Sequence, residues 1–472
     1  MKSFVCATVS SAALLWGMGA AVVGCGEQAA VGPGGASRGE AHDRREADAR
    51  QSARLDDGPL PIQAAPAHLA DPPANPRSAL NAALASGLLA PDTSANEKLR
   101  AVLRAAGVAE ASQVLVFSKT SLQDRLISPT RPRAIYFNDD CYIGYVPGGL
   151  VEYGDADPDP AIGSGLFAFD PDAGHAATLT TDTTCLNCHG GSRTNNRPGF
   201  LIRSVFPDED GFPITSAGST LVGHHTPIDK RWGGWYVTGE HGDLRHLGNL
   251  IAVEADDGRR VVFDREPGAN VTDLSPYFKT DHYLQPTSDI VALMVLEHQV
   301  QMHNLLTQGS SAVHERTEAS RSLAKYLGEP FDPAASDTLQ RVIDANAQRI
   351  VEHLLFSDEV ALDSPILGSA DYQRAFRANR REDKAGRSLK DFDLQTRIFK
   401  YRCSYMVYSR AFELMPDLLK HRVITKLRSV LAGSDRSEAF AHLATEERQA
   451  ISAILSETTH WYAPADITSN TR

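Results

Sequence analysis

The sequence predicts an α+β protein in which an antiparallel β-meander and a loop-rich segment precede a helical C-terminal half. Three observations support this class. Short β-branched and aromatic runs alternate with turn residues in the first region, residues 76–280. Apolar residues recur at spacings of three and four in the second region, residues 281–472. The chain of 472 residues is 42% hydrophobic and 22% charged, which is enough apolar material for a large core.

The composition also excludes several classes of protein. Lys and Arg total 47 against 59 Asp and Glu, which gives a net charge of -12. Such an acidic chain has no general attraction for nucleic-acid phosphates, so we expect no nucleic-acid partner. Six cysteines are too few for a small disulfide-stapled scaffold.

Residues 1–24 are expected to be a signal peptide. Lys2 precedes a short apolar stretch over residues 9–23, which is shorter than the about 20 apolar residues that span a bilayer. The end of the segment resembles the lipobox of bacterial lipoproteins, and this implies that Cys25 is lipidated and becomes the mature N-terminus. Gly26 is not the aspartate that retains such proteins in the inner membrane. The resemblance therefore implies an exported, periplasmic or outer-membrane lipoprotein; an ordinary cleaved signal is the alternative.

The next segment, residues 25–75, is predicted to be a flexible tether. It is rich in Ala, Gly, Pro, Asp and Arg and has almost no aromatic residues. Such a composition cannot bury enough apolar surface to offset the entropy lost on ordering. The folded part is expected to begin with two short helices within residues 79–106, where apolar residues recur at helical spacing.

Four short strands are expected after these helices, separated by turn residues such as Asn138-Asp139-Asp140 and Pro147-Gly148-Gly149. The predicted strands are 114–117, 134–137, 142–146 and 150–153. Residues 154–250 are rich in Gly, Pro, Asp and Thr and lack periodicity, so we expect ordered loops around a bound group.

The second half is expected to contain four helices, at residues 288–306, 339–355, 417–432 and 446–455. The third has the clearest apolar stripe, from Leu419 to Leu431. Pro416 stands where a first helical turn tolerates proline, and Gly433 follows as a stop signal.

The strongest chemical signal is the run Cys185-Leu186-Asn187-Cys188-His189. C-x-x-C-H is the attachment pattern of haem c, in which two thiols bond the porphyrin and the adjacent histidine ligates the iron. Over these five residues the chain resembles the c-type cytochromes, which implies one covalent haem c with Cys185 and Cys188 as attachment residues and His189 as the axial ligand. A thioredoxin-like pair would need a βαβ setting, and a structural zinc site usually has a second close pair of cysteines.

The motif occurs once in the chain, which argues against diheme peroxidases and multihaem electron carriers. The aromatic, glycine-rich segment and the helical half resemble uncharacterised exported bacterial proteins with a cytochrome c domain. We therefore expect a membrane-anchored mono-haem cytochrome that acts in electron transfer or in a haem-dependent redox reaction. The sequence assigns no catalytic residues. The partner of this cytochrome would be a redox protein or a small-molecule substrate. A peroxidase-like enzyme and a non-enzymatic haem sensor or partner-binding lipoprotein are the alternatives.

The second iron ligand is expected to be a histidine, unless that position is open. No methionine occurs between His189 and Met294, so methionine ligation from the following segment is excluded. The histidines available are His224, His225, His241 and His246. Of these, His225, His241 and His246 are the favoured candidates, and the last two lie in the aromatic, glycine-rich segment 231–249 that suits a cofactor pocket.

The predicted helix 288–306 is apolar almost all round in its first two turns, so it is expected to be buried. Glu297 and His298 would then need partners. Met294, His298 and Met302 share one face, and such a methionine stripe is more often core than ligand. The pairs Glu297-His298 and Glu352-His353 do not have the i, i+3 spacing of di-iron bundles, so we expect no second metal from them.

Two further expectations concern arginines and the remaining cysteines. Arginines near the motif are the natural donors for haem propionates; they are Arg193, Arg197, Arg203 and Arg231. Cys141 and Cys403 are predicted either to form a disulfide in an oxidising compartment or to be separate buried thiols.

Overall fold

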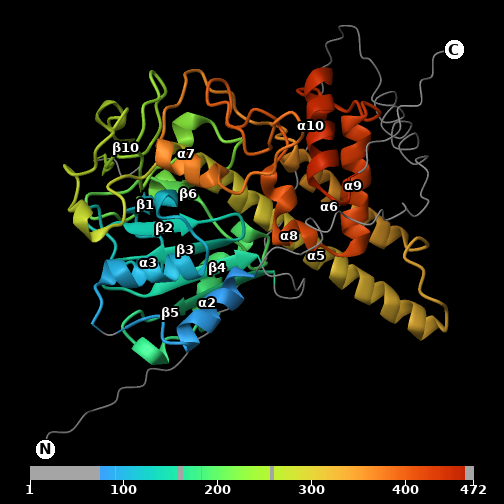
Figure 1. Ribbon diagram of the computed structural model, residues 1–472, viewed down its shortest axis with the longest axis horizontal. Helices are drawn as coiled ribbons and strands as arrows, with labels where there is room; N and C mark the ends of the chain where they lie inside the picture. The colour runs from blue at the N-terminus through green and yellow to red at the C-terminus, as the bar shows by residue number, and fades with distance from the viewer. Residues whose placement is uncertain (1–74, 91, 157–162, 182, 256–259, 463–472) are drawn as a thin grey trace, which may run out of the picture. The chain divides into compact units, whose positions relative to one another are not determined.

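The computed structural model describes residues 75–462, apart from residues 91, 157–162, 182 and 256–259 (Figure 1). The chain divides into two compact units, residues 1–61 and 62–472, and every described residue belongs to the second unit. The predicted signal peptide, Cys25 and nearly all of the predicted tether lie outside the described residues. The two predicted regions, 76–280 and 281–472, fall in the same unit.

A six-stranded antiparallel sheet forms the first half, in the order β5-β4-β3-β2-β1-β8. Its strands are β1 (Val114–Val116), β2 (Arg133–Phe137), β3 (Cys141–Tyr145), β4 (Val151–Ala156), β5 (Ser164–Phe169) and β8 (Trp235–Tyr236). Two small hairpins pair β6 (Arg203–Val205) with β7 (Ser219–Leu221) and β9 (Val253–Glu254) with β10 (Val261–Val262). The meander over β1 to β4 and the α+β class are confirmed, whereas β5 and β8 were not predicted.

The two faces of the sheet bury different cores, because successive side chains on a strand point to opposite sides. Leu115, Tyr136 and Ile143 pack with the apolar residues of helices α2 (Pro76–Ala85) and α3 (Ala95–Ala105), which lie along the sheet in Figure 1. Val116, Ile135 and Tyr142 belong instead to the core that contains the C-terminal helices. This second face supports the candidate site.

Helix α5 (Ile290–Leu327) is the longest element and is nearly twice as long as predicted. The Asp289 carboxylate caps its N-terminus by accepting from the Ala292 amide at 2.9 Å, and Gly328 ends it with a φ of 71°. The predicted end at Leu306 was wrong, since the apolar periodicity stops there while helical hydrogen bonding continues. Gly309 lets neighbouring helices approach, because a Cβ there would lie 3.3 Å from side chains of two of them.

In the second half, four helices pack against α5 and a fifth, α10, packs against α9 (Figure 1). They are α6 (Asp337–Leu354), α7 (Ala370–Arg377), α8 (Arg410–Glu413), α9 (Asp417–Leu431) and α10 (Thr445–Thr458), and a short α4 (Leu186–His189) precedes them. The four predicted helices are present, whereas α4, α7 and α8 were not predicted. None of the described helices combines the length and apolarity that crossing a membrane requires.

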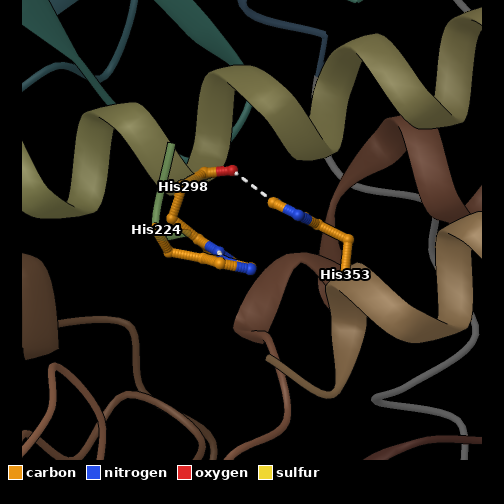
Figure 2. A group of neighbouring side chains, drawn as sticks. All are labelled: His224, His298 and His353. Carbon is orange, nitrogen blue, oxygen red and sulfur yellow. Dashed lines mark hydrogen bonds between the residues drawn. The ribbon is translucent and has the colours of Figure 1, made fainter. Parts of the chain in front are cut away.

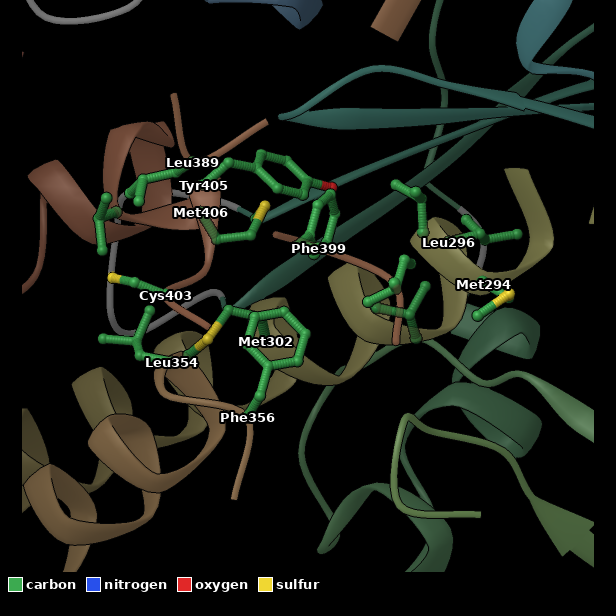
Figure 3. Close-up of a cluster of buried hydrophobic side chains, with 14 of the residues drawn as sticks. Met294, Leu296, Met302, Leu354, Phe356, Leu389, Phe399, Cys403, Tyr405 and Met406 are labelled. Atoms are coloured by element: carbon green, nitrogen blue, oxygen red, sulfur yellow. The ribbon is translucent and has the colours of Figure 1, made fainter. Parts of the chain in front are cut away.

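Figure 3 shows the core around α5, where Met302 lies near Leu354 and Phe356. Met294 and Met302 are both buried in this core, as expected for a methionine stripe of structural origin. Cys403 belongs to the same core, while Cys141 belongs to the core on the other face of the sheet. The two cysteines are therefore separate buried thiols, and the predicted alternative of a disulfide between them is wrong.

Candidate cofactor site

The cysteine pair and its histidine lie on one compact turn. A 3₁₀ turn over residues 183–185 leads directly into the single helical turn of α4, so residues separated by three and four share a side. Cys185, Cys188 and His189 all line one cavity of about 300 Å³. The structure thus brings the three predicted attachment and ligand residues to one place.

The His189 ring is oriented by a backbone carbonyl. Its Nδ1 lies 2.8 Å from the carbonyl oxygen of Gly199, which can only accept a hydrogen bond, so Nδ1 is the protonated nitrogen. Nε2 then keeps its lone pair. Burial lowers the pKa of His189 below its ordinary value, although the bond to Gly199 opposes this change. A histidine that ligates a metal is usually neutral, and the ring nitrogen that does not bind the metal usually donates a hydrogen bond to an oxygen such as a carbonyl.

The loop after His189 is fastened to helix α5 by side-chain amides. The Asn304 amide accepts from the Phe200 N–H and donates to the Phe200 carbonyl, both at 2.8 Å. One turn further along, the Gln308 carboxamide accepts from the Asn195 amide at 2.8 Å and donates to the Thr194 carbonyl at 3.2 Å. Residues four apart lie on one helix face, so a single face of α5 holds the loop that orients His189.

The cavity lies between the second face of the sheet and α5, and most of its wall is apolar. Its apolar lining includes Ile135, Leu166, Phe200, Ile202, Leu296 and Val300. Gly154 on β4 also lines it, and a Cβ at this position would lie 2.7 Å from the Phe200 ring. The absence of a side chain at Gly154 lets the Phe200 ring pack directly against the backbone of β4.

A few charged groups interrupt this apolar wall. Arg133 forms an ion pair with Glu152, which also accepts from Gln123 at 2.9 Å and from Ser121 at 3.2 Å. Burial alone would raise the pKa of Glu152, but Arg133 and these hydrogen bonds outweigh it and hold the pKa below its ordinary value. Glu152 is therefore ionised at neutral pH.

Two arginines at this wall, Arg133 and Arg203, each have a buried Nε with no hydrogen-bond partner among the described residues. Both arginines line the cavity. Buried donors without partners are rare in folded proteins, and a site that holds an anionic ligand is one explanation for them. Their positions suit the carboxylates of a cofactor that fills the cavity.

The other arginines considered from the sequence lie elsewhere. Arg197 forms a bidentate ion pair with Glu315, and both N–O distances are 2.7 Å. Arg231 is buried and pairs with Glu297, so the predicted need of Glu297 for a partner is confirmed. Arg193 lines a neighbouring cavity of about 230 Å³. Of the four predicted donors, Arg203 is the one that lines the cavity of the cysteine pair.

The histidines predicted as second iron ligands do not line this cavity among the residues described. His241 and His246 are buried against each other, with their Nε2 atoms 3.2 Å apart. Nδ1 of His246 accepts from the Gly248 N–H at 2.9 Å, and Nε2 of His241 accepts from the Asn270 N–H at 3.0 Å. Three of the four ring nitrogens thus have a hydrogen-bond partner, and Nδ1 of His241 is buried with none among the described residues.

His225 is exposed and lines the neighbouring cavity, which shares Phe200 and Ile202 with the cavity of the cysteine pair. A second iron ligand from His225, His241 or His246 stays a prediction.

Sequence reasoning did not find two features of this region. The fastening of the loop by Asn304 and Gln308 joins residues more than a hundred positions apart, and no local pattern marks it. The second feature is a group of three buried histidines, His224, His298 and His353, which come from three different segments.

Comparisons with known proteins add nothing to this geometry: no protein-family model matches the chain, and neither a curated protein nor a solved structure matches it. The site is therefore interpreted from its own residues.

Proposed function

We propose that the chain is an exported mono-haem c-type cytochrome, bound to a membrane through lipid on Cys25, that uses its haem in a redox reaction. One observation carries the proposal: Cys185, Cys188 and His189 line a single apolar cavity, and the His189 ring is held so that Nε2 keeps its lone pair. A haem c bound there would supply one-electron redox chemistry.

Each residue at the cavity has a distinct role in this proposal. The thiols of Cys185 and Cys188 provide the covalent links, and His189 provides the axial nitrogen. The unpaired Nε groups of Arg133 and Arg203 are suited to bind propionate carboxylates. The apolar side chains of the lining, with Phe200 packed against Gly154, exclude water from the cavity.

The described lining favours an open position opposite His189. It contains tyrosine, arginine and glutamate side chains, but no second histidine and no methionine among the described residues that form it. An open position permits binding of a small molecule, whereas two histidine ligands would favour simple electron transfer. We therefore favour small-molecule redox chemistry over the role of an electron carrier.

Covalent attachment can be tested by haem staining of denaturing gels, using protein made in a host that attaches haem c outside the cytoplasm. We expect stain in the wild type and none in the double variant Cys185→Ala, Cys188→Ala. The matched control is Cys141→Ala, Cys403→Ala, which removes two buried thiols away from the cavity and should keep the stain. Stain in the first double variant, or colourless wild-type protein, would refute the proposal.

The open position is tested by absorption spectra of the reduced protein with carbon monoxide and of the oxidised protein with peroxide. A rapid shift of the main haem band with either ligand is the expected result. A spectrum that neither ligand changes would contradict the open position, and it would favour a second protein ligand such as His225, His241 or His246.

Export and anchoring are tested by fractionation of cells that carry the full chain. Wild-type protein should sediment with membranes, and Cys25→Ser should release it without loss of haem stain from the Cys185–Cys188 site. Continued sedimentation of Cys25→Ser would count against the lipid anchor.

A further inference from the structure

Three histidines from distant parts of the chain meet in the core beside α5. His224 follows β7, His298 lies on α5 and His353 lies on α6 (Figure 2). Their side chains are at most 5% exposed, and one ring nitrogen from each lies within 4.8 Å of the others. The group is separate from the cavity of the cysteine pair, since none of the three lines that cavity.

The outer nitrogen of each ring contacts an oxygen atom. Nε2 of His224 lies 3.2 Å from the Ser357 carbonyl, and Nε2 of His353 lies 3.1 Å from the His298 carbonyl, the contact drawn in Figure 2. Carbonyls only accept, so Nδ1 keeps the lone pair in both rings. Nε2 of His298 lies 2.7 Å from the Ser404 hydroxyl. Metal-bound histidines typically have such an oxygen partner at the outer nitrogen.

The inner nitrogens are close together. Nδ1 of His224 and Nδ1 of His298 lie 3.0 Å apart. Zinc–nitrogen bonds of about 2.0–2.1 Å would separate two tetrahedral ligand atoms by about 3.4 Å. The first two histidines therefore already have a suitable separation, and His353 would have to approach them by up to about 1.4 Å to complete a three-nitrogen set.

The charge state of the rings also suits metal binding. Burial lowers the pKa of His224 and His298 well below the ordinary value and that of His353 to about 4, so all three are neutral at neutral pH. The neighbouring carboxylate of Glu297 is engaged by Arg231 and by the Trp232 indole N–H at 3.1 Å. Three neutral imidazoles are ligands that zinc and copper favour.

We propose that His224, His298 and His353 bind one late first-row transition-metal ion, zinc or copper, in a buried site. The bound ion would tie the segment after β7 to α5 and α6. The pairs Glu297-His298 and Glu352-His353 had led us to expect no second metal, because neither has the spacing of a di-iron bundle. The third ligand comes from a loop 74 residues before His298, which the local spacing does not reveal.

The test measures metal content of the full-length protein by mass spectrometry, after production in medium supplemented with Zn²⁺ and, separately, with Cu²⁺. We expect about one zinc or copper per chain in addition to haem iron. His224→Gln and His353→Gln should each lower this second metal at least about tenfold while iron and haem stain stay unchanged. His303→Gln is the matched control, since this histidine is also buried on α5 but lies outside the group.

A second measurement does not depend on the variants. Removal of the ion from wild-type protein with a chelator should lower the midpoint of thermal unfolding by several degrees, and added Zn²⁺ or Cu²⁺ should restore it. Wild-type protein with haem iron alone, and with a midpoint that neither ion changes, would overturn the proposal. In that case a metal-free hydrogen bond between His224 and His298 explains their contact. Because haem stain and zinc or copper content are separate measurements, failure of one proposal does not mask the other.

Discussion

The Tyr142 hydroxyl and Nδ1 of His303 lie 2.7 Å apart inside the core, where β3 meets α5. Both residues are buried, and Nε2 of His303 has no hydrogen-bond partner among the described residues. The contact is thus the one hydrogen bond that the described structure gives to this ring. The Tyr142 ring itself lines the cavity of the cysteine pair, so the bond links the cavity wall to α5.

Removal of this hydroxyl should destabilise the protein. Tyr142→Phe leaves the buried His303 ring without a partner, and the expected loss in the free energy of unfolding is about 1–3 kcal/mol. The measurement is urea unfolding at pH 7. Tyr326→Phe is the control, because Tyr326 is 87% exposed near the end of α5 and should change stability by less than about 0.5 kcal/mol. Equal stability of the two variants would show that the bond contributes nothing.

Loss of the Asn304 side chain should loosen the loop that orients His189. Asn304→Ala removes two hydrogen bonds to the Phe200 backbone, with an expected cost of about 1–3 kcal/mol. Hydrogen exchange of the Phe200 amide should become faster by more than the global loss of stability predicts. Asn346→Ala is the control, because the Asn346 amide donates to a carbonyl of its own helix. Unchanged exchange at Phe200 would contradict the role given to Asn304.

His303 should also make stability depend on pH. Burial lowers its pKa from 6.5 to about 3, so between these values the unfolded chain binds a proton there and the folded chain does not. The contribution is therefore fully present above pH 6.5 and is lost as the pH falls, by about 1.4 kcal/mol per pH unit.

This pH effect can be isolated by comparing two proteins. In unfolding measurements from pH 6 to pH 4.5, His303→Gln should have a shallower decline than the wild type, by about 1.4 kcal/mol per pH unit. Other buried histidines contribute equally to both proteins and cancel in the difference. Parallel declines would mean that His303 titrates alike in the folded and unfolded states.

The pair between Arg197 and Glu315 should be weak in spite of its two short contacts. Its side chains are 29% and 62% exposed, so water and salt screen the attraction. A double-mutant cycle with Arg197→Ala and Glu315→Ala should give a coupling of about 0.2–1 kcal/mol that declines in 1 M salt. A coupling above about 2 kcal/mol, or one that salt does not change, would show that this pair fastens the loop as strongly as Asn304 does.

The sequence predicted the strands and helices that a local residue pattern determines. Short β-branched and aromatic runs between turn residues predicted β1 to β4, and helical periodicity predicted the starts of α5, α6, α9 and α10. It missed β5, whose run from Ser164 to Phe169 includes a glycine and lies within a region rich in turn residues. It ended α5 too early because the polar residues after Leu306 have no apolar stripe, although Ser310 and Ser311 are buried against other elements.

The same limit applies to the candidate sites. The five residues of the motif identified Cys185, Cys188 and His189, since their chemistry depends on spacing along the chain. The partners of His189 and the three-histidine group depend on which distant segments pack against α5, and no pattern of single residues encodes that packing. A buried histidine such as His298 has the same appearance in the sequence whether it ligates a metal or only donates a hydrogen bond.

Helix α5 carries His298, which belongs to the proposed metal site, and Asn304, which holds the loop that orients His189. The two residues are six positions, or about 9 Å, apart along the helix. Both side chains are attached to one continuous helix. A shift of this helix along its axis by one residue, about 1.5 Å, would therefore displace both of them together. Any coupling of the two sites through this helix would be reciprocal, because each bound group would change the affinity of the other site by the same factor. Helix α5 therefore joins the two proposed sites in one continuous element.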